Sequence, residues 1–247
     1  MIFLVASAIQ GDAGMVKVLL LSGSNNHDWK ATTPVLKEIL EDSGLFQVDV
    51  QLNVAGMTAD SFKPYDVIVS NFNTFGMKHP GEVWNARVRA AFVDFISQGK
   101  GFVVIHAGSA SFYDWPEFQK IAGATWGKGT SHGKIHQETI CMTNSTHPIT
   151  AGLHSFATVD EFWQNAQLDP GAEILAQVTP GKDFGGSGKP EPMALTTHFG
   201  RGRGFTLLLG HNVQGMQSEG FKALLIRGTQ WAATGAVDPA GHAKQSK

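Results

Sequence analysis

Hydrophobic residues in the first half of the chain fall into short continuous runs that are separated by amphipathic segments. Residues 16–23, 65–72 and 101–107 are apolar runs of strand length. Such runs are typical of strands that are buried on both faces of a sheet. Residues 32–40 and 82–99 carry apolar residues at helical spacing, so we expect both segments to be helices. This alternation predicts an α/β protein with a mostly parallel, doubly wound sheet.

The second half of the chain contains more segments with strand character, followed by one helix. The closing helix is predicted over residues 219–235, where apolar residues recur at helical spacing. Residues 179–192 are rich in Gly and Pro and predict a flexible loop, of the kind that often serves as a lid or a binding loop. The remaining predicted strands are residues 46–53, 134–142, 173–178, 192–199 and 204–212.

The length and composition favour one compact domain. The chain has 247 residues, of which 42% are hydrophobic and 16% charged, and this is enough to build a sizeable core. We place the domain at residues 15–237 and expect residues 238–247 to be a polar tail. Residues 1–14 contain a short apolar run without a positively charged start, so they fit either a signal-peptide remnant or an extension before the domain. The localisation is therefore open between cytoplasmic and periplasmic or secreted.

Charge, hydropathy and cysteine content exclude several classes of protein. The net charge is −2 and no basic run occurs, which argues against a nucleic-acid partner. No segment is long and apolar enough to be a membrane span. Cys141 is the single cysteine, so a disulfide framework and a cysteine-based zinc cluster are both excluded. Because Cys141 lies in an alternating apolar run, we expect it to be a small buried side chain.

Polar residues directly follow several of the predicted strands. In a parallel α/β sheet the carboxyl ends of the strands meet at one edge, where ligands bind. His27, His106 and His211 follow three of these strands, and we expect them to converge as metal ligands or acid/base groups. One histidine at a strand end is usually structural, but three at equivalent ends favour a site. The asparagines expected to bind substrate at the same edge are Asn25, Asn71, Asn73 and Asn212.

A further histidine pair lies at i, i+4 spacing. His132 and His136 share one face of their segment, a geometry that suits a divalent ion. Gly133 argues against a rigid helix at this point, and we favour His132 over His136 as a site residue. The predicted metal ligands are His27, His106, His132 and His211, and the expected ion is zinc or manganese. No nucleotide cofactor is predicted.

The segment "VDEFWQN" at residues 159–165 places carboxylates ahead of two aromatic residues. Glu161 fits an acid/base group or a ligand, and Trp163 fits a ring that stacks on a sugar. The structural alternative is a turn that leads into core residues. We predict His106, Glu161 and His211 as the catalytic groups, with Trp163 among the substrate contacts.

Several stretches together resemble the ThuA-like (trehalose-utilisation) family. They are "SGSNNHDW", "GFVVIHAGSASFYDWPEFQKIAGATW", "THPITAGL", "DEFW", "HFGRGRGFTLLLGHN" and "LLIRGTQWAA". The resemblance covers residues 15–236 approximately. It implies a three-layer α/β/α sandwich of the class I glutamine amidotransferase-like type, related to flavodoxin-like folds. It also implies a role in carbohydrate metabolism, with sugars or 3-keto-glycosides as substrates.

In the related glutamine amidotransferases, the strand that corresponds to residues 101–107 ends in a G-x-C-x-G turn. This chain has "VIHAG" there, with His106 in place of the cysteine, so amidotransfer through a thioester is excluded. Ser109 and Ser111 follow the turn and leave a serine hydrolase as a weaker option. We expect a carbohydrate-processing enzyme that uses metal-assisted elimination, hydrolysis or isomerisation. The alternative is a non-catalytic carbohydrate-binding or regulatory module, and either form is compatible with a homo-oligomer.

Overall fold

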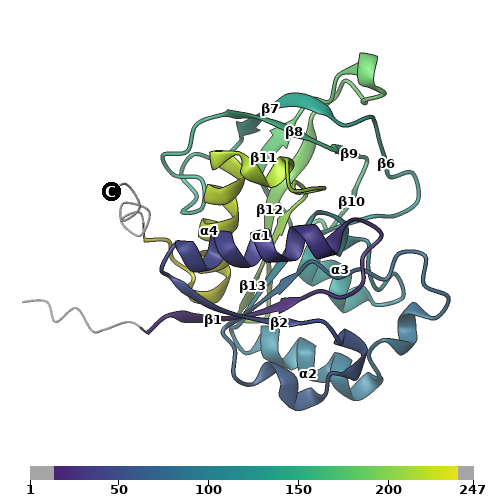
Figure 1. Ribbon diagram of the computed structural model, residues 1–247, viewed down its shortest axis with the longest axis vertical. Coiled ribbons are helices and arrows are strands. Elements are labelled where there is room, and N and C mark those ends of the chain that lie inside the picture. Colours follow the sequence, from purple (N-terminus) through teal and green to yellow (C-terminus); the bar gives the residue numbers. More distant parts are fainter. Residues whose placement is uncertain (1–13, 239–247) are drawn as a thin grey trace, which may run out of the picture.

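A nine-stranded sheet runs through the molecule, and helices cover both of its faces (Figure 1). The computed structural model describes residues 14–238. The strand order is β2-β1-β3-β4-β13-β12-β11-β7-β8. The parallel half consists of β1 (Val16–Leu21), β2 (Phe46–Gln51), β3 (Val67–Ser70), β4 (Gly101–Ile105) and β13 (Gly202–Leu207). The antiparallel half adds β12 (Glu191–Phe199), β11 (Glu173–Val178), β7 (His136–Met142) and β8 (Phe156–Asp160).

The parallel strands β1, β3, β4 and β13 are buried on both faces, as the continuous apolar runs predict, whereas the edge strand β2 exposes Gln47 and Asp49. In β1, Val18 and Leu20 pack into one core cluster, whereas Leu19 and Leu21 pack into the other. Such a split follows from the period of two in a strand, which sends successive side chains to opposite faces. Helices α1 (Trp29–Asp42) and α4 (Glu219–Thr234) cover the first cluster, and α2 (Ala86–Ser97) and α3 (Pro116–Ala122) cover the second. The predicted α/β/α layers are therefore confirmed.

The chain reverses its winding direction at β1. From β1 it moves outward to β2 and then returns to place β3 on the other side of β1. Ligands of doubly wound proteins bind outside the carboxyl ends of the strands at such a switch point. The loops after β1, β3, β4 and β13 all open at this edge of the sheet.

Two short antiparallel ladders lie beside this edge. Strand β6 (Ser131–His132) pairs with β9 (Trp163–Gln164), which sets His132 opposite Trp163. Strand β5 (Ala124–Thr125) pairs with β10 (Gln167–Leu168). The ladders bring residues 124–132 alongside residues 161–168, which are distant in sequence.

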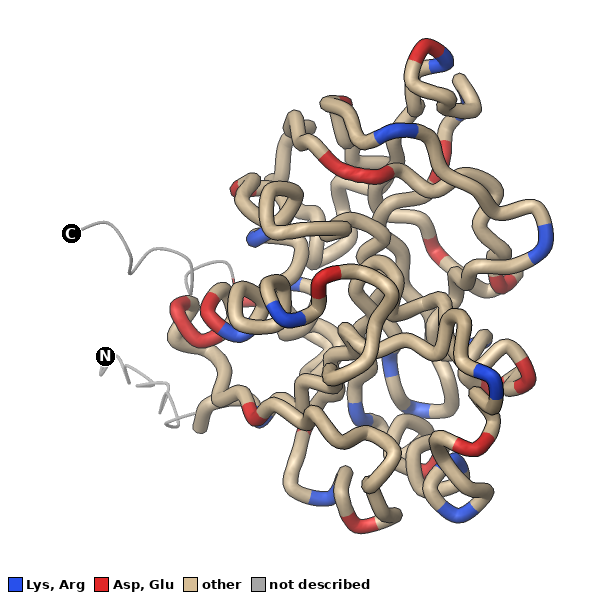
Figure 2. The backbone as a smooth tube through the Cα atoms, turned by 45° about the vertical axis from the view of Figure 1, so that its right-hand side comes forward, with Lys and Arg blue, Asp and Glu red and all other residues tan. Residues whose placement is uncertain are grey.

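The structure corrects one sequence expectation and leaves others outside its range. Cys141 is exposed and not buried, because β7 has one covered face and the alternation places Ile140 in the core and Cys141 outside. The predictions for residues 1–14 and 238–247 fall outside the described residues, apart from Gly14 and Asp238. Within the described region, none of the helices is long and apolar enough to cross a membrane. Acidic and basic residues are interspersed along the described backbone (Figure 2).

The Gly/Pro-rich loop at residues 179–190 packs on the β6–β7 segment. The carbonyl of Phe184 accepts a hydrogen bond from the Lys134 N–H at 2.8 Å, and the Phe184 ring stacks on His136 at 4.3 Å between centroids. The Gly181 N–H donates to Glu138 Oε1 at 2.9 Å. None of this loop lines the pocket described below, so the structure gives no support to its predicted role as a binding loop.

Candidate functional site

Three histidines and one glutamate converge at the switch-point edge of the sheet. They are His27, His106, Glu161 and His211, and one ligand atom from each lies within 4.8 Å of those of the others. His27 lies in the loop after β1, His106 directly follows β4, and His211 lies in the loop after β13. Glu161 lies between β8 and β9. The strand-end argument therefore places the three histidines correctly, and Glu161 joins them from the antiparallel half of the sheet.

The turn after β4 directs the His106 side chain into this cluster. His106 adopts a left-handed backbone conformation with φ of 41° at the start of a short 3₁₀ turn, residues His106–Ser109. Gly108 lets the turn lie against β3, because a Cβ at this position would lie 2.5 Å from the Ser70 carbonyl oxygen. Left-handed backbone at a non-glycine residue is strained and tends to persist at functional sites.

A carbonyl group fixes the tautomer of His106. Its Nδ1 lies 2.8 Å from the carbonyl oxygen of Leu208, which can only accept a hydrogen bond, so Nδ1 carries the proton. In the neutral imidazole Nε2 then presents a lone pair, and Nε2 faces Glu161 Oε1 at 3.4 Å. A carboxylate oxygen is also an acceptor. These two atoms therefore repel each other unless a cation or a proton lies between them.

The other two imidazoles also have a buried nitrogen without a hydrogen-bond partner. Within residues 14–238, His27 Nε2, His106 Nε2 and His211 Nδ1 are all buried and lack a hydrogen-bond partner. His211 Nδ1 lies 3.5 Å from Glu161 Oε1, and the rings of His27 and His211 lie 4.3 Å apart. Buried polar atoms are nearly always satisfied, so three unpartnered imidazole nitrogens around one carboxylate mark this group as a candidate cation site. Ligand atoms about 2.1 Å from one ion are at most about 4 Å apart, so the cluster would need to contract only slightly.

The electrostatics of the cluster favour a neutral His27 and an ionised Glu161, as a metal requires, but they also favour protonation of His211. Burial and the neighbouring imidazoles lower the pKa of His27 to about 4, so this ring is neutral near pH 7. Burial opposes ionisation of Glu161, but the imidazoles of His106 and His211 outweigh it and hold the pKa of this carboxyl well below its usual range. Glu161 in turn raises the pKa of His211 against the effect of burial.

His132 lies beside the cluster and outside the group of four. Its Nδ1 lies 3.1 Å from Glu161 Oε2 and 2.9 Å from the Gly133 carbonyl oxygen. It thus contacts the carboxylate oxygen that faces away from His106 and His211. The side chain is 43% exposed. The structure does not bring His136 to the site, because its Nε2 lies 3.1 Å from Glu138 and its ring packs on Phe162 and Phe184.

Asp160 holds the two halves of the cluster together. Its carboxylate is fully buried and accepts hydrogen bonds from the backbone N–H groups of Gly210, His211 and Glu161, at 2.7, 3.0 and 2.9 Å. Gly210 has a φ of 98°, which turns its N–H toward this carboxylate at little steric cost. Burial raises the pKa of Asp160, and His106 and the three N–H groups oppose this rise. The sequence motif placed Asp160 beside Glu161 but did not assign it this role.

The predicted substrate-binding asparagines serve mainly to build the loops. Asn25 accepts the His27 N–H at 2.9 Å and donates to the Asn71 carbonyl at 3.0 Å. The buried Asn71 donates to the hydroxyls of Thr32 and Thr33. The buried side chain of Asn73 donates to Asn25 and Asn26, and Asn212 accepts the Gly215 N–H. The amides of Asn25, Asn71, Asn73 and Asn212 thus stabilise the loops that carry the histidines, and none of them lines the pocket.

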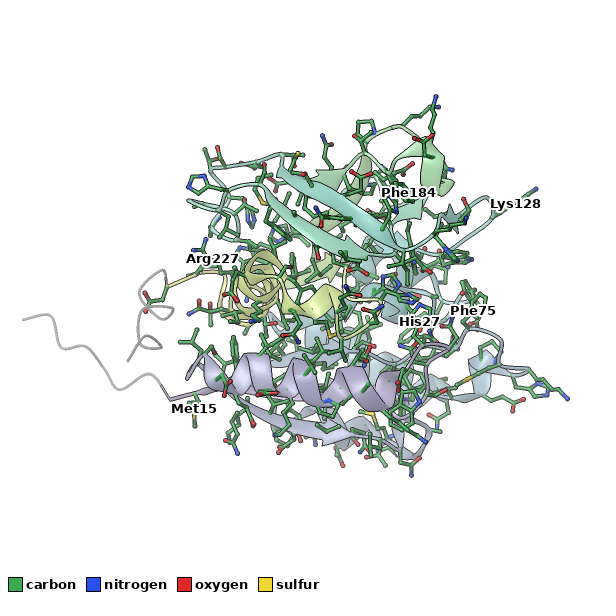
Figure 3. All side chains as sticks on the ribbon, turned by 45° about the horizontal axis from the view of Figure 1, so that its top comes forward. Met15, His27, Phe75, Lys128, Phe184 and Arg227 are labelled. Carbon is green, nitrogen blue, oxygen red and sulfur yellow. The ribbon has the colours of Figure 1, made fainter. Side chains whose placement is uncertain are left out.

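A pocket of about 180 Å³ opens over the cluster. His27, Glu161 and His132 contribute polar groups to its wall, and Ala107 and Ala110 contribute small side chains. Figure 3 shows His27 and Phe75 close together at this face of the molecule. The remaining lining residues are Asn26, Phe75, Trp126 and Trp163. Of these, the sequence predicted Trp163 as a substrate contact and placed Asn26 among the polar residues after the first strand, whereas Phe75 and Trp126 were not identified. The order of strands after residue 124, which brings in Trp126, was not readable from one sequence.

The two serines of the turn after β4 have structural partners. Ser109 is buried and donates to the carbonyl of His106 at 3.0 Å. Ser111 is buried, donates to the Phe72 carbonyl and accepts the Thr74 N–H. Among the described residues, neither hydroxyl forms a hydrogen bond to an imidazole, so the geometry does not support a serine nucleophile.

Comparison with known proteins agrees with the fold. The sequence matches the ThuA family, described as trehalose utilisation, over residues 17–232. A ThuA-like protein from Parabacteroides merdae is 30% identical, with 90% of this chain and 91% of that chain covered and a TM-score of 0.81. A ThuA-like protein from Bacteroides uniformis is 19% identical, with 94% and 98% covered and a TM-score of 0.69.

The fold is also similar to that of a more distant protein. A Thermoplasma acidophilum protein described as a GMP synthase subunit shares this fold at 10% identity, with 90% of this chain and 95% of that chain covered and a TM-score of 0.51. A search of curated protein sequences finds no match. The family match spans most of the chain and includes every residue of the cluster, and the protein therefore belongs to the ThuA family.

Proposed function

We propose that this protein is a carbohydrate-processing enzyme that depends on a divalent metal ion held by His27, His106, Glu161 and His211. The observation that supports this most directly is the contact between His106 Nε2 and Glu161 Oε1. When His106 is neutral, two buried acceptors face each other at 3.4 Å, and the Leu208 carbonyl prevents a change of tautomer, so only a proton or a metal ion between them removes the repulsion. In protein metal sites, a carbonyl on the far nitrogen commonly fixes a histidine ligand in this way.

The donor set of three imidazoles and one carboxylate suits zinc or manganese. It differs from the set expected from the sequence, because Glu161 takes the place of His132. When bound, the ion would supply Lewis-acid polarisation of a carbonyl oxygen on the sugar. The chain's own contribution is to hold His27 neutral and Glu161 ionised, with His106 Nε2 and His211 Nδ1 facing that carboxylate.

His132 is our candidate for the group that moves a proton on the substrate. It lines the pocket, and its Nδ1 is engaged by the Gly133 carbonyl and by Glu161, which leaves Nε2 for the substrate. A sugar ketone has an acidic proton on the carbon next to the carbonyl. Removal of this proton by a positioned imidazole would allow elimination or isomerisation. The ThuA family's link to trehalose utilisation supports a carbohydrate substrate, and we propose 3-keto-glycosides as the substrate class.

Metal analysis tests the proposal directly. Protein purified without a histidine tag should contain about one zinc or manganese ion per chain, measured by mass spectrometry of the elements. Removal of the ion with a chelator should abolish turnover of a 3-keto-glycoside, and the same ion should restore it. Protein that holds no ion, and that zinc and manganese leave unchanged in both binding and activity, would contradict the metal proposal.

The affinity for the ion should fall as the pH falls. The bound state needs His211 unprotonated, and Glu161 raises the pKa of His211 above its ordinary value of 6.5. As the pH is lowered, protons therefore begin to compete with the metal ion already above pH 6.5. Each further decrease of one pH unit should weaken metal binding by up to about tenfold per proton taken up by the ligands. The pKa of His27, lowered to about 4, delays competition at that ring to acid pH. Competition titration with a chromophoric chelator between pH 5 and 8 measures this slope, and a flat profile would contradict it.

A further inference from the structure

A continuous row of aromatic rings leads from the cluster to the surface. The His106 ring lies 5.3 Å from Trp163, Trp163 lies 4.9 Å from Trp126, and Trp126 lies 6.3 Å from Phe75, all between centroids. Exposure rises along the row, from 2% at Trp163 to 46% at Phe75. Trp163 and Trp126 meet nearly edge-on, at an interplanar angle of 81°, as do Trp126 and Phe75 at 80°.

Both outer rings sit on loops that hydrogen bonds hold in place. The Phe75 N–H donates to Asn73 Oδ1 at 3.3 Å, and Asn73 is itself bound to Asn25. The turn after Trp126 is closed by Thr130, whose hydroxyl accepts the Gly127 N–H at 3.0 Å and donates to the Asn165 carbonyl at 2.9 Å. Large apolar side chains on anchored loops are preorganised for contact, because little conformational entropy is lost when a ligand binds.

The pocket over the cluster is too small for an extended substrate. Its volume is about 180 Å³, whereas pockets that enclose a drug-sized ligand have roughly 300–1,000 Å³. One sugar ring could occupy it, and any further part of the substrate must lie outside. The exposed ring of Phe75 and the partly buried ring of Trp126 lie where the pocket meets solvent, next to the polar groups of Asn26 and His132.

On the basis of the proposed function, we infer that Phe75 and Trp126 form a second subsite, which binds a second sugar ring joined to the one in the pocket. Aromatic faces bind the apolar face of a pyranose, and the side-chain amide of Asn26, which lines the pocket, offers hydrogen bonds to sugar hydroxyls. The enzyme would thus act on the terminal ring of a disaccharide. Phe75 would contribute to the choice of substrate without contact with the reacting atoms.

Calorimetric binding to the metal-loaded protein tests this inference. The probes are methyl 3-keto-α-glucopyranoside, trehalose oxidised at C3 of one ring, and phenyl 3-keto-α-glucopyranoside. The oxidised trehalose should bind roughly tenfold more tightly than the methyl glycoside, since one aromatic contact of this size is worth about that factor. Phe75→Ala and Trp126→Ala should each weaken binding of the oxidised trehalose more than binding of the methyl glycoside, so that most of the roughly tenfold preference is lost.

Phe184→Ala is the matched control. Phe184 is 45% exposed, close to the value for Phe75, but it lies on the loop at residues 179–190 and does not line the pocket. This variant should keep the preference for the disaccharide. Equal affinity of the wild-type protein for the methyl and disaccharide probes would overturn the second subsite and leave the proposed function standing. Tighter binding of the phenyl glycoside alone would overturn the assignment to a sugar ring. If no probe bound, the proposed function would fall, and the subsite with it.

Discussion

Replacement of His106 by alanine is expected to abolish turnover and to reduce the metal affinity of the protein severely. His106 is 2% exposed, its tautomer is fixed by the Leu208 carbonyl, and its Nε2 faces Glu161 directly. The loss of a residue that merely orients a ligand costs about 10–100-fold in affinity or activity. The loss of the ligand itself should exceed that range. Metal content after dialysis and the rate with a 3-keto-glycoside measure the two effects.

The fold must survive for this result to be informative. His106 has a left-handed backbone conformation, which asparagine tolerates better than alanine does. His106→Asn is therefore the second variant, and it should show the same loss of metal with less loss of thermal stability. His79→Ala is the matched control, because the side chain of His79 is 71% exposed and pairs with Glu82 on its own turn. Retention of both metal and turnover in His106→Asn would contradict the proposed site.

The same experiment separates an enzyme from a non-catalytic carbohydrate-binding module. A binding module would show no turnover in the wild-type protein, and the substitution would change only its affinity for sugar. An enzyme should lose turnover by orders of magnitude. Geometry alone supports a site, whereas turnover is what distinguishes these two functions.

The histidines of the cluster could be predicted from the sequence because each one directly follows its own strand, so no long-range contact had to be inferred. His27, His106 and His211 each follow an apolar run, and such strands end at one edge of the sheet. Glu161 follows β8, at the far side of the antiparallel half. Its arrival at the cluster depends on the hydrogen bonds of Asp160 to a loop some fifty residues further along the chain, at Gly210 and His211. The hydrophobic pattern of the sequence does not predict such a long-range contact.

For the asparagines, the position after a strand was not enough to predict the role of the side chain. Their positions after the strands suggested contacts with a sugar, but loops that fold back over a sheet edge bury backbone groups that must be satisfied. Asn25 meets this need at the Asn71 carbonyl and the His27 N–H, and the Asn71 side chain ties its loop to the hydroxyls of Thr32 and Thr33. Residue type and position alone do not distinguish a side chain that builds a loop from one that faces a ligand.

Asp160→Asn is expected to weaken metal binding although Asp160 is outside the group of four. The carboxylate accepts three backbone N–H groups, two of which belong to the cluster residues His211 and Glu161. An amide offers one acceptor oxygen and places an N–H₂ donor against the remaining N–H group. An unsatisfied buried group of this kind costs about 1–3 kcal/mol of stability. The resulting shift of His211 and Glu161 should lower metal affinity by about 10–100-fold, the range found when a supporting partner is lost.

A destabilised control distinguishes positioning from a general loss of stability. Ile39→Val removes one methylene from the packing of α1 in the core and should cost about 0.5–1.5 kcal/mol. This variant should keep the affinity of the wild-type protein, measured by chelator competition at a temperature where both variants are folded. If Asp160→Asn bound metal as tightly as Ile39→Val, the carboxylate would be a purely structural group. If metal affinity fell in Asp160→Asn but not in Ile39→Val, the buried carboxylate would set the spacing of His211 and Glu161. Asp160 is outside the group of four, so its hydrogen bonds can affect metal affinity only by positioning these two residues.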